Sequence, residues 1–213
     1  MMSNLKEDPI RVDPRIRREP MLVPMRVTPK NWTPDAPITL KNGTKTTISA
    51  LAQQRDLVLH FFYTRCNGTC PVTTQNLKKV ARMMPGKFEK NALILSISLD
   101  PERDTVGNLN VFAGRHNLPQ WWQVARCDRQ ALDSLLDSIG FNAEPYDSKT
   151  KAIVHASEVI FGSQKTGRWR MANPQWSEPH VVKELFEITF DGVHYRNPRR
   201  PGVTLDRTRR SRA

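Results

Sequence analysis

The middle of the chain alternates between continuous apolar runs and stretches in which apolar residues recur with a helical period. Residues 56–63 (DLVLHFFY) and 92–99 (ALILSISL) are short apolar runs, as expected of strands that are buried on both faces. Residues 72–84 place apolar side chains at helical spacing, and the Pro-Gly pair that follows ends the pattern. The spacing predicts strand, helix and strand over residues 56–99, with the helix beginning near residues 67–69.

The same alternation continues in the next part of the chain. A second helix is predicted from an N-cap at Asp104 to about Gly114, followed by a short strand at 121–125. Residues 128–140 have the clearest helical pattern, because an aspartate stands at the N-cap position and a glycine at the end. The apolar face of this helix comprises Leu132, Leu135, Leu136 and Ile139.

The last patterned segment predicts a hairpin and a final helix. Residues 152–162 have a mixed strand pattern, and a turn at 163–167 joins them to residues 168–172. A capping signature then opens an amphipathic helix at 177–188. This order of elements predicts one α/β domain in which helices flank a mixed sheet. Phosphate-binding glycine motifs are absent from the sequence, which argues against nucleotide chemistry.

Both ends of the chain depart from this pattern. Residues 1–37 are rich in proline and residues 198–213 are rich in arginine, and neither segment has a helical or strand period. Such segments bury too little apolar surface to offset the entropy lost on ordering. We therefore expect two extended arms around a compact domain at residues 38–197.

Charge narrows the classes of partner. The chain carries a net charge of +12, most of it in the arms, and a basic tail can meet nucleic acid, an anionic membrane surface or an acidic protein. The tail lacks interleaved aromatic residues and the core has no nucleic-acid-binding motif, so we disfavour nucleic acid and favour docking in a larger assembly. With no signal peptide and no long apolar run, the sequence predicts neither standard export nor a transmembrane segment.

Two of the three cysteines stand four positions apart in YTRCNGTCPV (63–72), directly after a predicted strand. A helix that begins here would place Cys66 and Cys70 about one turn apart on the same face, and its dipole would lower the pKa of both thiols. Thiolates attack disulfides and bind soft metals. A thioredoxin-type redox pair has one intervening residue fewer than this loop. The extra residue does not forbid a disulfide, and it makes binding of one ion by both sulfurs geometrically natural. The loop therefore fits a redox pair, a two-sulfur metal clip or two buried thiols.

Three segments together resemble the SCO/SenC family. FFYTRCNGTCPVTTQNL is similar to that family's cysteine loop, in which an aromatic strand ending in YT or FT runs into CxxxCP. SISLDPERDT (96–105) resembles its strand-end segment, and KAIVHASEVIFG (151–162) resembles its late hairpin strand with a single histidine. The order and spacing of the segments agree as well, over roughly residues 35–188.

This resemblance implies a thioredoxin-like fold and a copper-binding function. By position, the copper ligands would be Cys66, Cys70 and His155, and Asp100 would shape the loop beside them. Family members help to load copper onto cytochrome c oxidase, so the resemblance implies a metallochaperone rather than an enzyme, with a copper-accepting partner such as an oxidase subunit. It also implies an extracytoplasmic location, either the periplasm or the mitochondrial intermembrane space. The family's usual acidic residue before the histidine is Val154 in this chain.

Two other functions stay open. In a thiol–disulfide oxidoreductase, Cys66 would attack a partner disulfide and Cys70 would resolve the mixed disulfide. In a non-catalytic subunit, the fold would be retained while the arms wrap around a larger complex. The remaining candidates are more simply interpreted as structural residues than as metal ligands. His60 falls in a predicted buried strand, and Cys127 ends a short strand, where a buried small residue is common.

Overall fold

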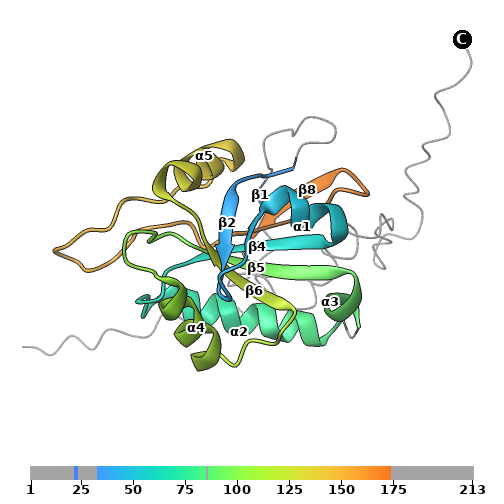
Figure 1. The fold of residues 1–213 in the computed structure, drawn as a ribbon, viewed down its shortest axis with the longest axis horizontal. Helices are drawn as coiled ribbons and strands as arrows, with labels where there is room; N and C mark the ends of the chain where they lie inside the picture. Colours follow the sequence, from blue (N-terminus) through green and yellow to red (C-terminus); the bar gives the residue numbers. More distant parts are fainter. Residues whose placement is uncertain (1–21, 24–32, 85, 174–213) are drawn as a thin grey trace, which may run out of the picture.

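A computed structural model describes residues 22–23, 33–84 and 86–173 of the chain. They form one eight-stranded mixed sheet in the order β1-β8-β7-β4-β5-β6-β2-β3 (Figure 1). The strands are β1 (Leu22–Val23), β2 (Pro37–Leu40), β3 (Lys45–Thr47), β4 (Asp56–Phe62), β5 (Ala92–Ser98), β6 (Trp122–Arg126), β7 (Val159–Ser163) and β8 (Arg168–Ala172). The helices are α1 (Ile48–Gln54), α2 (Thr69–Arg82), α3 (Lys87–Lys90), α4 (Val106–Arg115) and α5 (Arg129–Ile139).

The centre of the sheet is parallel and fully buried. β4 pairs with β5 along its whole length, and β5 pairs with β6, both in parallel register. Every residue of β4 and β5 is buried, which explains why their sequences are continuous apolar runs without alternation. The outer strands β7, β8, β2 and β3 join antiparallel.

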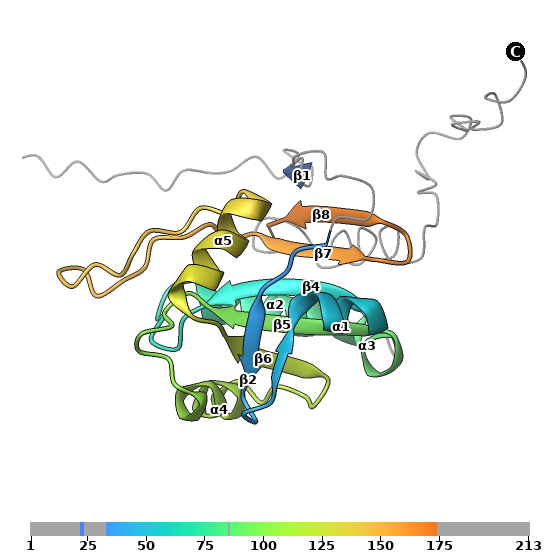
Figure 2. The ribbon, with the colours of Figure 1, turned by 45° about the horizontal axis from the view of Figure 1, so that its top comes forward.

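Helices cover both faces of the sheet. Helices α2 and α4, which connect the parallel strands, lie on one face, while α1 and α5 lie on the other (Figures 1 and 2). Both β4–α2–β5 and β5–α4–β6 are parallel crossovers, which place their helices on the same side. Two consecutive aromatic residues of β4 point to opposite faces of the sheet and contact both helical layers. Phe62 packs on Phe112 of α4, and Phe61 packs on Phe141, which follows α5. This arrangement confirms the predicted α/β sheet flanked by helices.

Helix ends follow local sequence, with one correction. Asp128 caps α5 by accepting a hydrogen bond from the Ala131 amide, and Gly140 ends that helix in a left-handed conformation, both as predicted. The predicted N-cap of α4 at Asp104 is wrong. Thr105 caps α4 in a capping box with Asn108, because the side chain of Asp104 is buried and points elsewhere.

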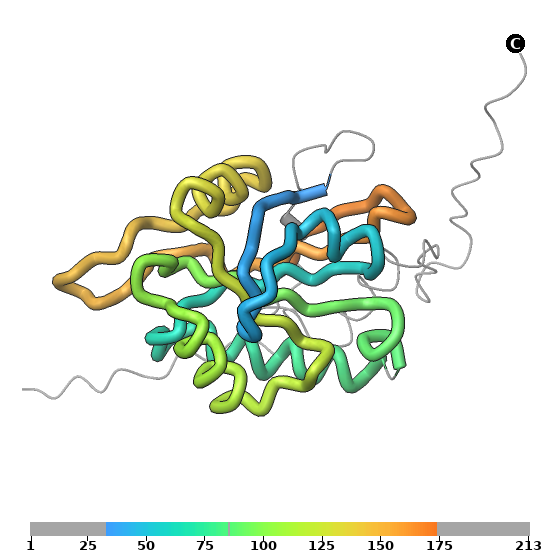
Figure 3. Tube along the Cα trace, viewed as in Figure 1, coloured from blue at the N-terminus to red at the C-terminus, as the bar shows by residue number. Residues whose placement is uncertain are grey.

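The predicted strand at 152–162 is mostly wrong. β7 begins only at Val159, and the preceding segment is the returning leg of a long hairpin over residues 142–156. This hairpin, held by isolated bridges rather than by a ladder, projects from one end of the domain (Figures 1 and 3). Polar residues interrupt its sequence, and only its base reaches the apolar core.

Several elements escaped sequence analysis, and some predictions fall outside the described residues. β2, β3, α1 and α3 are short elements whose sequences carry too few apolar positions to show a period. The predicted helix at 177–188, the tail at 198–213 and most of the arm at 1–37 lie outside the described residues. Among the described residues, the structure has no helix with both the length and the apolar character that crossing a bilayer requires.

Candidate metal centre

The cysteine loop lies where the central strand β4 gives way to helix α2. The turn begins with a hydrogen bond from the Cys66 amide to the Tyr63 carbonyl, at 3.1 Å. Helix α2 starts at Thr69, so Cys70 belongs to its first turn, as the sequence predicts. The Cys70 side chain is buried, whereas Cys66 is half-buried. The loop therefore turns one sulfur toward the interior and leaves the other close to the surface.

His155 reaches this loop from the base of the projecting hairpin. Its backbone bridges to Ala143 on the opposite leg, and its Nδ1 lies 2.7 Å from the carbonyl oxygen of Ala156. A carbonyl can only accept, so Nδ1 donates this hydrogen bond, and in the neutral imidazole the lone pair belongs to Nε2. That Nε2 atom lies 3.7 Å from the Sγ of Cys70. The hairpin thus presents the metal-binding nitrogen of the imidazole to the cysteine pair.

The structure brings together all three residues that the resemblance assigned to copper. The Sγ atoms of Cys66 and Cys70 and a ring nitrogen of His155 all lie within 4.8 Å of one another. Among the described residues, this is the one such group of three or more histidine, cysteine or acidic side chains. Two sulfurs and one imidazole form a soft donor set, which suits copper and, with a fourth ligand, zinc.

The two cysteines share a proton unequally. A hydrogen bond from Cys70 is the main reason that the pKa of Cys66 lies well below that of an ordinary thiol. The same hydrogen bond, together with burial, raises the pKa of Cys70. The prediction that both thiols have a lowered pKa is therefore wrong for Cys70. Of the two thiols, Cys66 therefore ionises more readily and Cys70 holds its proton more tightly.

Tyr63 connects the cysteine loop to the hairpin, and sequence analysis missed it. Its buried ring meets the ring of His155 edge-on, with 6.1 Å between centroids. Burial is the first reason that its pKa is raised; hydrogen bonding to the Cys66 sulfur also raises it, and a hydrogen bond with the Ile153 backbone opposes the shift. An aromatic residue at the end of a buried strand carries no sequence signal for such a contact.

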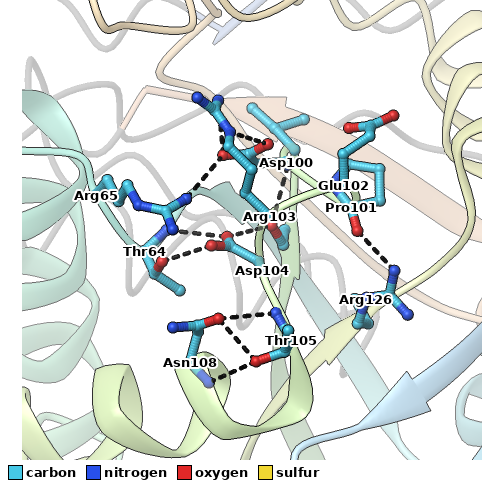
Figure 4. A network of polar contacts seen from close by, with 12 residues as sticks. Thr64, Arg65, Asp100, Pro101, Glu102, Arg103, Asp104, Thr105, Asn108 and Arg126 are labelled. Atoms are coloured by element: carbon cyan, nitrogen blue, oxygen red, sulfur yellow. Dashed lines mark hydrogen bonds and ion pairs between the residues drawn. The ribbon is translucent and has the colours of Figure 1, made fainter.

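Asp104 fixes the cysteine loop from the neighbouring strand end (Figure 4). Its fully buried carboxylate accepts hydrogen bonds from the Thr64 amide, at 3.0 Å, from the Thr64 hydroxyl and from the Ser98 hydroxyl. The carboxyl ends of β4 and β5 are thereby joined two residues before Cys66. The residue predicted as a helix cap therefore holds the loop that carries the first cysteine.

Asp100 forms a second link between these segments (Figure 4). Its carboxylate, whose side chain is only 2% exposed, lies 2.8 Å from Nη2 of Arg103 and 3.7 Å from Nη1 of Arg65. Arg65 directly precedes Cys66 in the chain, so Asp100 contacts the loop without touching either sulfur. The structure thus places Asp100 beside the site, as the resemblance implied.

A cavity of about 470 Å³ lies behind Asp100, between the strand end, α5 and the outgoing leg of the hairpin. None of the three clustered ligand residues lines it. Four carboxylates and two guanidinium groups face this space, and Glu102 is held by Arg129 at 2.7 Å. The cavity therefore lies beside the metal centre rather than within it, and its lining combines charged side chains with apolar ones.

The other candidates lie away from the cluster. His60 is buried in β4 with its Nδ1 3.0 Å from Ser96 Oγ, and burial lowers its pKa to about 3, so it is a neutral core residue. Cys127 is buried, which raises its pKa to about 12. The residue before His155 is a valine, Val154, so no carboxylate accompanies the histidine at that position, and the Val154 side chain is 63% exposed. His180 and His194 lie outside the described residues.

The cysteine pair and the hairpin histidine lie in a region that a family model matches. The SCO1/SenC family model matches residues 36–189, which include all three residues of the cluster. The chain belongs to the SCO1/SenC family. No curated protein sequence gives a match.

Solved structures of the family share the fold of this SCO1/SenC chain. ScoI of Bradyrhizobium japonicum with copper bound is 20% identical, with a TM-score of 0.60 over 72% of this chain and 96% of that one. A SCO1/SenC family lipoprotein from Bacillus anthracis is 16% identical, with a TM-score of 0.62 over 80% and 96%. Yeast Sco1 with copper bound is 13% identical, with a TM-score of 0.59 over 71% and 83%. These similarities confirm the predicted thioredoxin-like fold.

Proposed function

We propose that this chain is a copper carrier that binds one copper ion through Cys66, Cys70 and His155 and passes it to a copper-accepting protein. The observation that carries the proposal is the convergence of two sulfurs and one imidazole nitrogen within 4.8 Å. Family membership supports it, as do the copper-bound structures of ScoI and yeast Sco1. The recipient would be cytochrome c oxidase or a related copper enzyme in an extracytoplasmic compartment.

The protonation pattern favours capture of a soft cation. The lowered pKa of Cys66 lets this ligand lose its proton readily, and His155 uses Nδ1 for the Ala156 carbonyl, which leaves Nε2 as the nitrogen that faces the cysteines. Cys70 must lose its proton when the ion binds, and the positive charge of the ion favours that loss. Cys66 is half-buried, so a partner's cysteine can reach the ion from that side and displace the ligands one at a time.

Anaerobic titration with Cu(I) against a competing chelator tests copper binding. We expect roughly one equivalent to bind, and Cys66→Ser, Cys70→Ser and His155→Ala each to weaken binding. Cys127→Ser and His116→Ala are matched controls, since both residues lie outside the cluster. Absence of binding near one equivalent, or equal affinity in the cluster variants and the controls, would contradict the proposal.

A second function is favoured by the unequal thiols. A half-buried thiolate beside a buried thiol is the arrangement of an attacking and a resolving cysteine. Cys66 would attack a partner disulfide and release one partner thiol. Cys70, after losing its proton, would attack Cys66, release the second thiol and leave an intramolecular disulfide. His155→Ala separates the two functions, because it removes a copper ligand but leaves both exchanging thiols; the loss of its hydrogen bond with Cys66 should raise the pKa of Cys66 without abolishing thiol exchange.

A further inference from the structure

The two legs of the hairpin that carries His155 are joined by hydrogen bonds between them. Glu144 N–H donates to the Val154 carbonyl at 2.8 Å, and Asp147 N–H donates to the Ala152 carbonyl at 2.9 Å. These rungs make the two legs one unit, so a contact made by one leg restrains the other. The hairpin nevertheless projects beyond the body of the domain (Figure 3). Its position relative to the cysteine loop depends on its contacts with the domain, which include Ile153, a core residue two positions before His155.

Tyr146, on the outgoing leg, makes one such contact. The guanidinium carbon of Arg103 lies 3.0 Å from the centroid of the Tyr146 ring. The ring is partly buried against the core, and the Arg103 side chain is 27% exposed. A guanidinium over an aromatic face is an attractive contact, and partial removal from water strengthens it.

Arg103 is itself held in place from the other side. Its Nε donates to Asp100 Oδ1 at 3.0 Å, and its Nη2 lies 2.8 Å from Asp100 Oδ2, a two-point contact that sets the plane of the guanidinium. The same carboxylate faces Arg65, the neighbour of Cys66 (Figure 4). One arginine therefore touches both the support of the cysteine loop and the hairpin that carries the histidine.

We propose that Arg103 and Tyr146 form a clasp that sets the position of His155 relative to Cys66 and Cys70. Both are positioning residues, since neither lies among the atoms that converge on the metal centre. The inference rests on the proposed function, because Arg103 and Tyr146 would raise copper affinity only by holding His155 in place. The clasp restrains the outgoing leg, and the rungs of the hairpin carry that restraint to the returning leg.

Cu(I) affinity, measured by chelator competition, tests the clasp. We expect Tyr146→Ala to weaken binding by about 10-fold, in the range seen when a group that orients a metal ligand is removed. Tyr146→Phe is the matched control, since it keeps the aromatic face and removes only the hydroxyl, which also interacts with the Arg103 side chain, so its affinity should stay close to that of the wild type. In a His155→Ala background, Tyr146→Ala should cause no further loss, because the residue through which it acts is gone.

Hydrogen exchange of the metal-free protein gives a readout that does not depend on copper. The amides of Glu144 and Ala156 donate across the hairpin, and we expect both to exchange faster in Tyr146→Ala but not in Tyr146→Phe. Melting temperatures of the variants identify any general loss of fold. If wild type binds no copper, the proposed function fails, and the exchange rates still decide whether the clasp restrains the hairpin.

Three results would overturn the clasp. The first is wild-type affinity and wild-type exchange in Tyr146→Ala. The second is a Tyr146→Ala effect of equal size with and without His155, since the residue would then act through general stability. The third is equal weakening by Tyr146→Phe and Tyr146→Ala, because the hydroxyl rather than the ring face would then be responsible.

Discussion

The two segments that supply the cluster are held in different ways. The cysteine loop is short, follows a buried parallel strand and is tied down by Asp104 and Asp100 from the next strand end. The histidine lies on a hairpin that projects from the domain and is held at its base and by the contact between Arg103 and Tyr146. A rigid pair of sulfurs therefore faces a ligand on a more adjustable support, an arrangement that suits an ion that must be released.

Of the changes considered, loss of the Asp104 carboxylate should destabilise the cysteine loop and the domain most. Asp104→Ala removes the acceptor of three hydrogen bonds and leaves the half-buried Thr64 and the buried Ser98 donors without it. We expect the free energy of unfolding to fall by about 2–4 kcal/mol, measured by urea denaturation. Asp137→Ala, at an exposed carboxylate on α5, is the control. A loss no greater than that of the control would show that the cysteine loop does not depend on this anchor.

Loss of Asp100 should have a smaller effect on stability and reach both segments. Asp100→Ala leaves Arg103 and Arg65 without their shared carboxylate, but both arginines are partly exposed and can be hydrated. We expect a fall of about 1–2 kcal/mol in the free energy of unfolding, together with weaker copper binding. If stability falls while copper affinity stays at the wild-type value, Asp100 supports the fold and not the metal centre.

The reactivity of Cys66 toward an alkylating agent tests whether the cysteine loop lowers the pKa of this thiol. Its pKa is lowered, so it is already ionised at neutral pH, and its alkylation by iodoacetamide should change little between about pH 6 and 8. An ordinary thiol, with a pKa near 8.5, would react roughly tenfold faster for each added pH unit in that range. Cys70→Ala removes the hydrogen bond that stabilises the thiolate and should restore the ordinary pH dependence. Steep dependence in the wild type would mean that Cys66 is protonated.

The tip of the hairpin should matter least. Asp147 accepts hydrogen bonds from the amides of Lys149 and Thr150 and from the Thr150 hydroxyl, and the Lys149 amide is the first reason that its pKa is lowered, followed by the Thr150 hydroxyl. Asp147→Ala should raise hydrogen exchange at those two amides and leave the melting temperature and copper affinity unchanged, since the tip lies beyond the Tyr146 contact. A loss of copper affinity would mean that the whole hairpin, and not its clasped part, positions His155.

Sequence patterns predicted the centre of the fold well, for a physical reason. β4, β5, α2 and α5 bury long apolar runs or faces, and such burial leaves a clear period in the sequence. The hairpin could not be predicted, because its conformation depends on isolated bridges and on contacts with residues far away in the chain. Its histidine was assigned by family resemblance rather than by periodicity.

The surroundings of the cluster were only partly predictable. Asp104 stands two positions before the first residue of α4, and an aspartate so close to a helix start favours an N-cap, so local sequence favoured the wrong role. Its true partner, Thr64, is 40 residues away. The opposite pKa shifts of Cys66 and Cys70 likewise arise first from the hydrogen bond between the two sulfurs and then from the deeper burial of Cys70, and both follow from packing rather than from the spacing of the two cysteines.

Cys70 and His155 are separated by 85 residues in the chain, although their side chains meet at 3.7 Å. The two cysteines stay neighbours in any conformation, whereas the histidine joins them only when the whole domain has folded. An ion bound by all three residues would therefore stabilise the native state over the unfolded chain by mass action. Thermal unfolding with and without metal would thus report on the completeness of the centre, and the gain in melting temperature should shrink when His155 is replaced.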